Sequence, residues 1–183
     1  MSVLIITLLI GLIIGWIRGG SIWSFRSLPL KSIWLLPLSY ILQYISIYFL
    51  HGLYYQVVIL ISFLTLFYFC YVNHKIGGIK WAFIGTALNF LVMVSNSLRM
   101  PAYMPAVNQL NPKAVSLMEH GQIGKSIAMT SHTHLNFLGD IFLFNIQPSA
   151  LMSVGDILFS VGLIILIQFA MRIERETSSN AIV

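Results

Sequence analysis

Residues 132–171 read HTHLNFLGDIFLFNIQPSALMSVGDILFSVGLIILIQFAM and contain one short pattern twice, LGDIF at 138–142 and VGDIL at 154–158. Asp140 and Asp156 in these two pentapeptides are the only carboxylates of the chain that lie within apolar surroundings. The second pentapeptide begins the last long apolar run, which is long enough to cross a bilayer. We therefore expect both aspartates to lie at or inside a membrane.

The composition of the whole chain agrees with a membrane protein. Of its 183 residues, 58% are hydrophobic and 8% are charged, whereas a soluble domain carries about 25% charged residues. The mean hydropathy is +0.88. The formal charge of +5 comes from basic residues at the ends of apolar runs, which favours a role in membrane orientation over nucleic-acid binding. The bilayer is thus the expected partner, and no nucleic acid is expected.

Five apolar runs predict an all-α fold, a polytopic membrane helix bundle that forms a single membrane domain over residues 1–183. The five predicted transmembrane helices are residues 3–17, 33–50, 55–72, 81–98 and 152–171. About eighteen apolar residues at 1.5 Å each suffice to span the hydrocarbon layer. Residues 135–144 are apolar but too few to cross, so they predict a short re-entrant or interfacial helix. Residues 111–126 predict a second, interfacial helix.

The distribution of basic residues predicts the orientation of the bundle. Seven of the ten fall on one side of it, where they define the cytoplasmic side: Arg18, Arg26, Lys31, Lys75, Lys80, Arg172 and Arg175. The other side keeps Arg99, Lys113 and Lys125. We therefore expect a multi-pass protein of the cell membrane with its N-terminus outside and its C-terminus in the cytoplasm, and an extracytoplasmic segment at residues 99–151.

A stripe of small residues marks the first predicted helix. Gly11, Gly15 and Gly19 recur every four residues, a spacing that lets a neighbouring helix approach closely in lipid. The stripe is a candidate contact with a partner helix, although glycine is also simply common in membrane helices.

The polar residues at the predicted outer boundary are the candidate site. Ionisable groups at membrane depth are costly and by default mark a functional site. The candidate ligand-binding residues are Asn96, Arg99, His134, Asp140 and Asp156.

Each aspartate has a structural alternative. Ser153 three residues before Asp156 forms a capping-box pattern at the start of the last helix, and Asp140 could pair with Arg99. If the two aspartates instead meet, one keeps its proton, and the pair becomes a candidate catalytic dyad of the aspartic-protease kind. The sequence leaves these alternatives open.

Two histidines suggest a metal site as a further possibility. His132 and His134 point the same way if their segment is extended, and together with Asp140 they could bind zinc, while Met100 and Met104 would suit copper(I). A lone His-x-His in a polar loop is usually solvated. We expect no metal and no cofactor.

The motifs resemble those of a family of small bacterial integral membrane proteins whose function is not assigned. That family's pattern has an Asn-Gly-Gly-Arg-Met-Pro stretch, a Leu-Gly-Asp and a Ser-Ile-Gly-Asp that opens the last helix. The corresponding residues here are Asn96–Pro101, Leu138–Asp140 and Ser153–Asp156. Ser97 and Leu98 replace the double glycine. The resemblance implies a membrane site built from Asn96, Arg99, Asp140 and Asp156, and no known activity.

The last helix also has a fainter likeness to lipoprotein signal peptidases, in which an aspartate opens the last helix and another lies upstream at the outer face. Asp140 is followed by Ile141, where those enzymes carry Arg, and five helices are predicted here instead of four.

Three functions follow from these observations. The first is an outward-facing polar pocket that binds or helps to move a small or lipid-linked ligand. The second is an intramembrane aspartyl hydrolase that uses Asp140 and Asp156. The third is a structural subunit of a membrane assembly that uses the glycine stripe.

Overall fold

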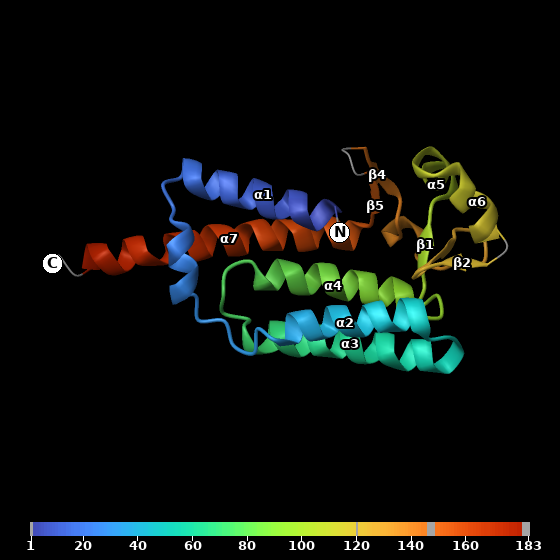
Figure 1. The fold of residues 1–183 in the computed structure, drawn as a ribbon, viewed down its shortest axis with the longest axis horizontal. Helices are drawn as coiled ribbons and strands as arrows, with labels where there is room; N and C mark the ends of the chain where they lie inside the picture. Colours follow the sequence, from blue (N-terminus) through green and yellow to red (C-terminus); the bar gives the residue numbers. More distant parts are fainter. Residues whose placement is uncertain (1, 120, 146–148, 181–183) are drawn as a thin grey trace.

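Five long helices lie side by side in the computed structural model, which describes residues 2–119, 121–145 and 149–180 (Figure 1). They are α1 (Ser2–Ile17), α2 (Leu35–Phe49), α3 (Gly52–Val72), α4 (Ile79–Val94) and α7 (Val154–Asn180). A short 3-10 helix, η1 (Ile22–Ser27), follows α1. The structure is mostly helical, as predicted, and the helices fall where the apolar runs placed them.

Two of the described helices, Gly52–Val72 and Val154–Arg172, are long and apolar enough to cross a membrane. The other three apolar helices are shorter: Val3–Ile17, Leu35–Phe49 and Ile79–Val94. Positive φ values account for one of the shortened ends. Ser97 (φ 55°) and Leu98 (φ 59°) follow the end of α4. They lie in the left-handed region, which an α-helix cannot include, so the expected helix at 81–98 ends earlier, at Val94, and the expected helix at 33–50 is observed as Leu35–Phe49.

Helices α4 and α7 approach so closely that their backbones touch. A Cβ atom added to Gly85 would clash with the carbonyl oxygen of Gly155, and one added to Gly155 would clash with the side chain of Asn89. A second such contact lies seven residues away, where a Cβ atom added to Gly78 would clash with the carbonyl oxygen of Gly162. Glycines spaced by seven residues on both helices therefore allow this contact, as small residues do between membrane helices.

Helix α1 packs on the opposite side of α7 through the predicted stripe. A Cβ atom on Gly11 would lie 2.6 Å from Cδ1 of Ile167, and one on Gly15 would clash with the sulfur of Met171. Gln168 Nε2 also donates a hydrogen bond of 2.6 Å to the Gly11 carbonyl oxygen. These two glycines thus face α7 of the same chain, and Gly19 (φ 72°) lies in the turn after α1.

A third contact layer joins α2, α3 and α4. Its buried centre contains Tyr55, Ile59 and Phe63 from α3 and Val92 and Met93 from α4. The Ser46 hydroxyl of α2 donates a 2.9 Å hydrogen bond to the Tyr55 carbonyl oxygen, which fixes the α2–α3 hairpin.

Residues 99–153, here called the cap, cover one end of the bundle (Figure 1). The cap contains β1 (Met100–Ala102), α5 (Met104–Leu110), α6 (Pro112–Glu119), β2 (Gln122–Ile123), β3 (Ser126–Ala128), η2 (Asn136–Leu138), β4 (Phe142–Phe144) and β5 (Ala150–Met152). One sheet has the order β1-β3-β2, with β1 and β3 parallel, and a second consists of the antiparallel pair β4-β5. The small buried core of the cap is Ala102, Val107 and Met118.

The cap corrects two expectations about helices. Residues 135–144 form no re-entrant or interfacial helix: they form the single turn η2, a bend at Gly139, and strand β4. Aromatic and β-branched residues favour strands, and pairing with β5 satisfies the backbone of β4. Of the expected helix at residues 111–126, only the first half is helical, and the second half forms β2 and β3. The fold is therefore not purely all-α.

Candidate functional site

Asp156 lies at the start of α7, and its carboxylate is held by Ser153, just before the helix, and by Asn89 of α4. Its backbone N–H donates to the Ser153 hydroxyl (2.9 Å), and its Oδ2 accepts from the Ser153 backbone N–H (3.1 Å). This reciprocal pair is the capping box that the sequence predicted. Its Oδ1 accepts a 2.9 Å hydrogen bond from Asn89 Nδ2 in α4, and the Ser153 hydroxyl donates to Asn89 Oδ1 (2.6 Å). Both oxygens of the carboxylate are thus occupied and oriented.

Asp140 is held by its backbone alone. Its N–H donates to the Pro101 carbonyl oxygen (2.9 Å), and its own carbonyl oxygen accepts from the Tyr103 N–H (3.0 Å). The residue is only 8% exposed, yet no described residue donates a hydrogen bond to its carboxyl group. Burial raises the pKa of this carboxyl to about 7; the nearby Lys125 charge opposes the shift, and the Asp156 charge adds to it.

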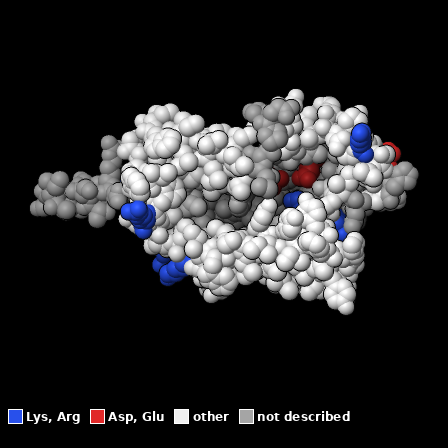
Figure 2. Space-filling view, viewed as in Figure 1, with Lys and Arg blue, Asp and Glu red and all other residues white. Residues whose placement is uncertain are grey.

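The two aspartates line one cavity, together with Lys125. The cavity has a volume of about 370 Å³ and lies between the first turn of α1, the start of α7, β5 and the β2–β3 turn. Figure 2 shows acidic side chains in a hollow of the face drawn there, with a basic side chain beside them. The remaining walls are mainly apolar: Val3, Leu4, Ala150, Leu151, Met152 and Phe159, with Ser160. A second cavity of about 160 Å³ adjoins it between the helices and shares Lys125, Asp156 and Phe159.

Arg99 contributes to the site indirectly. Its guanidinium lies over the Tyr55 ring, 3.5 Å from the centroid, and donates a 2.6 Å hydrogen bond to the Gly124 carbonyl oxygen. Lys125 follows Gly124 in the chain, and its carbonyl oxygen accepts a 2.8 Å hydrogen bond from the Met100 N–H. Arg99 does not line the cavity, and among the described residues no ion pair joins it to Asp140. It therefore fixes the turn that carries Lys125.

The backbone of Arg99 enters the cap through a turn in which Ser97 and Leu98 both have positive φ. These are the positions where the resembling family's pattern has glycine, so the turn forms here with two non-glycine residues. The Tyr55 hydroxyl donates to the Leu98 carbonyl oxygen (2.8 Å) and stabilises the turn.

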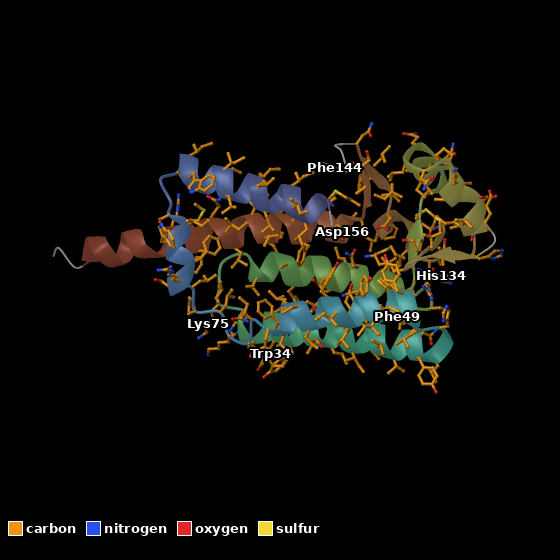
Figure 3. The ribbon with its side chains drawn as sticks, in the orientation of Figure 1. Trp34, Phe49, Lys75, His134, Phe144 and Asp156 are labelled. Atoms are coloured by element: carbon orange, nitrogen blue, oxygen red, sulfur yellow. The ribbon has the colours of Figure 1, made fainter. Side chains whose placement is uncertain are left out.

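Asn96 and His134 are joined, but through the backbone of His134. Asn96 Nδ2 donates to the His134 carbonyl oxygen and Asn96 Oδ1 accepts from the His134 N–H, both at 2.8 Å. The amide side chain thus pins the loop before η2 to the end of α4. The imidazole of His134 is exposed and lies at the cap end of the bundle, away from Asp156 (Figure 3). In the part of the chain that the structure describes, no group of three His, Cys, Asp or Glu residues could hold a metal ion.

The structure therefore brings Asp140 and Asp156 to one cavity and uses Asn96 and Arg99 to position the cap around it. Two cavity residues were missed. Lys125 appeared in the sequence only as one of three outer basic residues, and Asn89 gave no signal except that it is a polar residue inside an apolar run.

Comparison with protein-family models identifies the family of the chain. The model of the family of unknown function DUF5317 matches residues 27–168. The chain belongs to this family. The match includes α2, α3, α4, the whole cap and most of α7, and therefore every residue of the site except the α1 wall. No curated protein and no solved structure matches the chain. Membership in DUF5317 agrees with the resemblance to a family without an assigned function.

Proposed function

We propose that this DUF5317 protein is a polytopic membrane protein whose five long helices all cross the bilayer, with the cap on the extracytoplasmic side. Large apolar side chains remain exposed on the outer faces of the bundle, for example Ile13 (52%), Leu53 (71%) and Leu64 (53%). A soluble monomer rarely exposes a large continuous apolar surface. The shorter helices are about 23 Å long. Exposed aromatic residues lie at their ends, such as Trp34 and Phe49. Such residues suit the membrane interface, so the segment that can lie within the membrane is longer than the helix itself.

The charges support the orientation. Lys75 lies near the end of α3, at the end of the bundle opposite the cap (Figure 3). The loop before α2 lies at the same end, because Asn73 forms hydrogen bonds with the backbone of Lys31 in that loop. An excess of basic residues marks the cytoplasmic side. We therefore place the N-terminus outside and the C-terminus in the cytoplasm. Reporter fusions after α4 and after α7 test this: an extracytoplasmic reporter active only after α4 is the expected result.

We further propose that the cavity at the junction of cap and bundle binds the polar head of a small or lipid-linked ligand. One observation carries this proposal: Asp140 is 8% exposed and lacks a hydrogen-bond donor among the described residues, while it lines the same cavity as Lys125 and Asp156. A buried polar group without a partner costs free energy unless a bound molecule completes it. The volume of about 370 Å³ lies at the lower end of the range for small-molecule sites.

We propose binding as the role of this site. At the cytoplasmic end a cluster of buried side chains is apolar: Leu35, Phe69, Cys70, Ile76 and Ile79. The buried polar side chain of Asn73 at that end is engaged by the backbones of Lys31 and Phe69, and none of the buried residues described there is charged, which favours binding over transport. Lys125, and not Arg99, is the cation that meets the ligand, because the Arg99 guanidinium is engaged by Tyr55 and Gly124.

Filling the cavity tests the binding proposal. Leu4 lines the cavity, whereas the next residue, Ile5, does not and is similarly exposed (47% and 52%). Mass spectrometry of small molecules and lipids that co-purify with the protein is expected to show a species that is retained by Ile5→Trp and lost from Leu4→Trp. Equal retention by both variants would contradict the proposed site.

A second candidate function is an intramembrane aspartyl hydrolase. It is favoured by the presence of Asp140 and Asp156 in one cavity and by the effect of the Asp156 charge on the pKa of Asp140, the relation found in catalytic carboxylate pairs. Against it, both oxygens of Asp156 are already hydrogen-bonded, to Asn89 and Ser153. Under this alternative, Asp156→Asn and Asp140→Asn would each abolish cleavage of a membrane substrate and cause that substrate to accumulate.

A further inference from the structure

A third cavity lies inside the cap, and Asp140 lines it as well. It has a volume of about 310 Å³ and is lined mostly by apolar side chains, including Val107, Leu110, Ala114 and Met118. It shares Asp140, Ala150 and Leu151 with the charged cavity. The two cavities are therefore neighbours that share these three residues, with an apolar chamber in the cap and a charged chamber at the junction of cap and bundle.

Two charged side chains are buried among the described residues, Arg99 and Asp140; Arg99 donates to the Gly124 carbonyl oxygen, whereas no described residue donates to the Asp140 carboxyl. Every side-chain nitrogen or oxygen there that is fully shielded has a hydrogen-bond partner, including those of Asn96 and Ser153. The Asp140 carboxyl has none among the described residues, so its oxygens retain slight exposure, and the residue lines two cavities. The missing partner is a hydrogen-bond donor, since an ionised carboxylate can only accept.

The charges of the cavity indicate which donor fits. Two carboxylates, Asp140 and Asp156, face one ammonium group, Lys125, and no ion pair within the described residues neutralises them. A ligand with a positive charge would balance the cavity, whereas an anion would meet two negative groups and one positive group. The strongest hydrogen bonds to carboxylates are those from charged donors.

On the basis of the proposed ligand site, we infer that the ligand is an amphiphile whose amine lies between Asp140 and Asp156 and whose apolar group occupies the chamber in the cap. The amine donates to the unpartnered carboxyl of Asp140, and Lys125 remains available for an anionic group on the same molecule. The apolar side chains of Val107 and Met118 line the chamber in the cap and contact the apolar group of the ligand, whose removal from water favours binding.

The inference predicts a direction for the pH dependence. The charged groups that act on Asp140 are Lys125 and Asp156, and its pKa is about 7. Because only the ionised carboxylate balances an ammonium group, binding of an amine strengthens as the pH rises from 6 to 8. A neutral or anionic ligand would show no change or the opposite one.

Three probes of equal chain length separate the ligand classes: n-hexylamine, 1-hexanol and hexanoate. Their binding is measured by equilibrium dialysis of radiolabelled probe against the full chain in phosphatidylcholine nanodiscs, with empty nanodiscs as background. We expect hexylamine to bind at least about tenfold more tightly than the other two, and Asp140→Asn to weaken it about 10- to 100-fold, the range for loss of a charged hydrogen-bond partner.

A matched pair of variants tests the chamber in the cap. Ala114→Phe fills the chamber, whereas Leu117→Phe changes an exposed side chain of the same helix that does not line it. Ala114→Phe is expected to weaken hexylamine binding while methylamine still binds, and Leu117→Phe to change neither. The elution volume on size exclusion confirms that each variant is folded.

The outcomes distinguish this inference from the proposed function. If hexanol or hexanoate binds as tightly as hexylamine, or if Asp140→Asn leaves hexylamine binding unchanged, the amine assignment is wrong and the head-group site remains. If no probe exceeds the empty-nanodisc background, both the amine assignment and the head-group site are overturned.

Discussion

Replacement of Asp140 by Asn is expected to stabilise the protein, and by an amount that depends on pH. The carboxyl is 8% exposed, and burial raises its pKa from 3.8 to about 7. In the unfolded chain the group is solvated and ionises near its ordinary pKa. The difference between 3.8 and about 7 corresponds to about 4 kcal/mol of unfavourable free energy for the ionised form in the folded state.

The sign follows from proton binding. Below about pH 4 the carboxyl is protonated in both states and costs nothing. Between about pH 4 and 7 the unfolded chain has released the proton and the folded chain retains it, so the stability of the wild type falls as the pH rises. Above about pH 7 the full cost is present. Asn keeps the shape without the charge, but also leaves a buried polar group without a partner, so we expect Asp140→Asn to gain about 2–4 kcal/mol at pH 8.

Thermal unfolding in detergent between pH 4 and 9 measures this difference. For a chain of this size, 1 kcal/mol shifts the Tm by about 2–4 °C, so the gain at pH 8 is roughly 5–15 °C and disappears near pH 4. Glu119→Gln is the control, because Glu119 is an exposed carboxylate in the same cap, and its curve should parallel that of the wild type. Parallel curves for Asp140→Asn and the wild type would refute the reasoning, as would a less stable variant at pH 8.

Three further substitutions test the fold and the site. Gly85→Ala should lower stability by about 1–3 kcal/mol or more, because the new Cβ meets backbone atoms of α7; Gly121→Ala, where the nearest atom is 4.0 Å away, should have little effect in the same thermal unfolding assay. Ser97→Gly should raise the Tm by a few degrees, corresponding to about 0.5–1 kcal/mol, since glycine adopts the observed φ of 55° without strain; an unchanged or lower Tm would argue against strain in this turn. Arg99→Gln should cost about 2–4 kcal/mol through the lost ring contact and hydrogen bond, and should weaken ligand binding through displacement of Lys125; full binding by a folded variant would remove the positioning role.

The sequence determined what depends on neighbours along the chain. The apolar runs located four of the five long helices to within four residues at each end, because burial of a continuous apolar surface requires no knowledge of its partner; α7 continues nine residues beyond the expected end at Met171. The Ser153–Asp156 capping box could be identified for the same reason, since both hydrogen bonds join residues three apart. The grouping of Asp140 with Asp156 was proposed from a repeated motif, but their separation in space could not be calculated from it.

The tertiary structure alone decided the contacts between distant segments. Residues 135–144 became a turn and a strand because β5 pairs with β4. Lys125 entered the cavity because Arg99 and Met100 hold its turn, 25 residues along the chain. The glycine stripe of α1 found its neighbour in α7 of the same chain. In each case the free energy comes from a pairing of surfaces far apart in sequence, and local propensity does not contain that information.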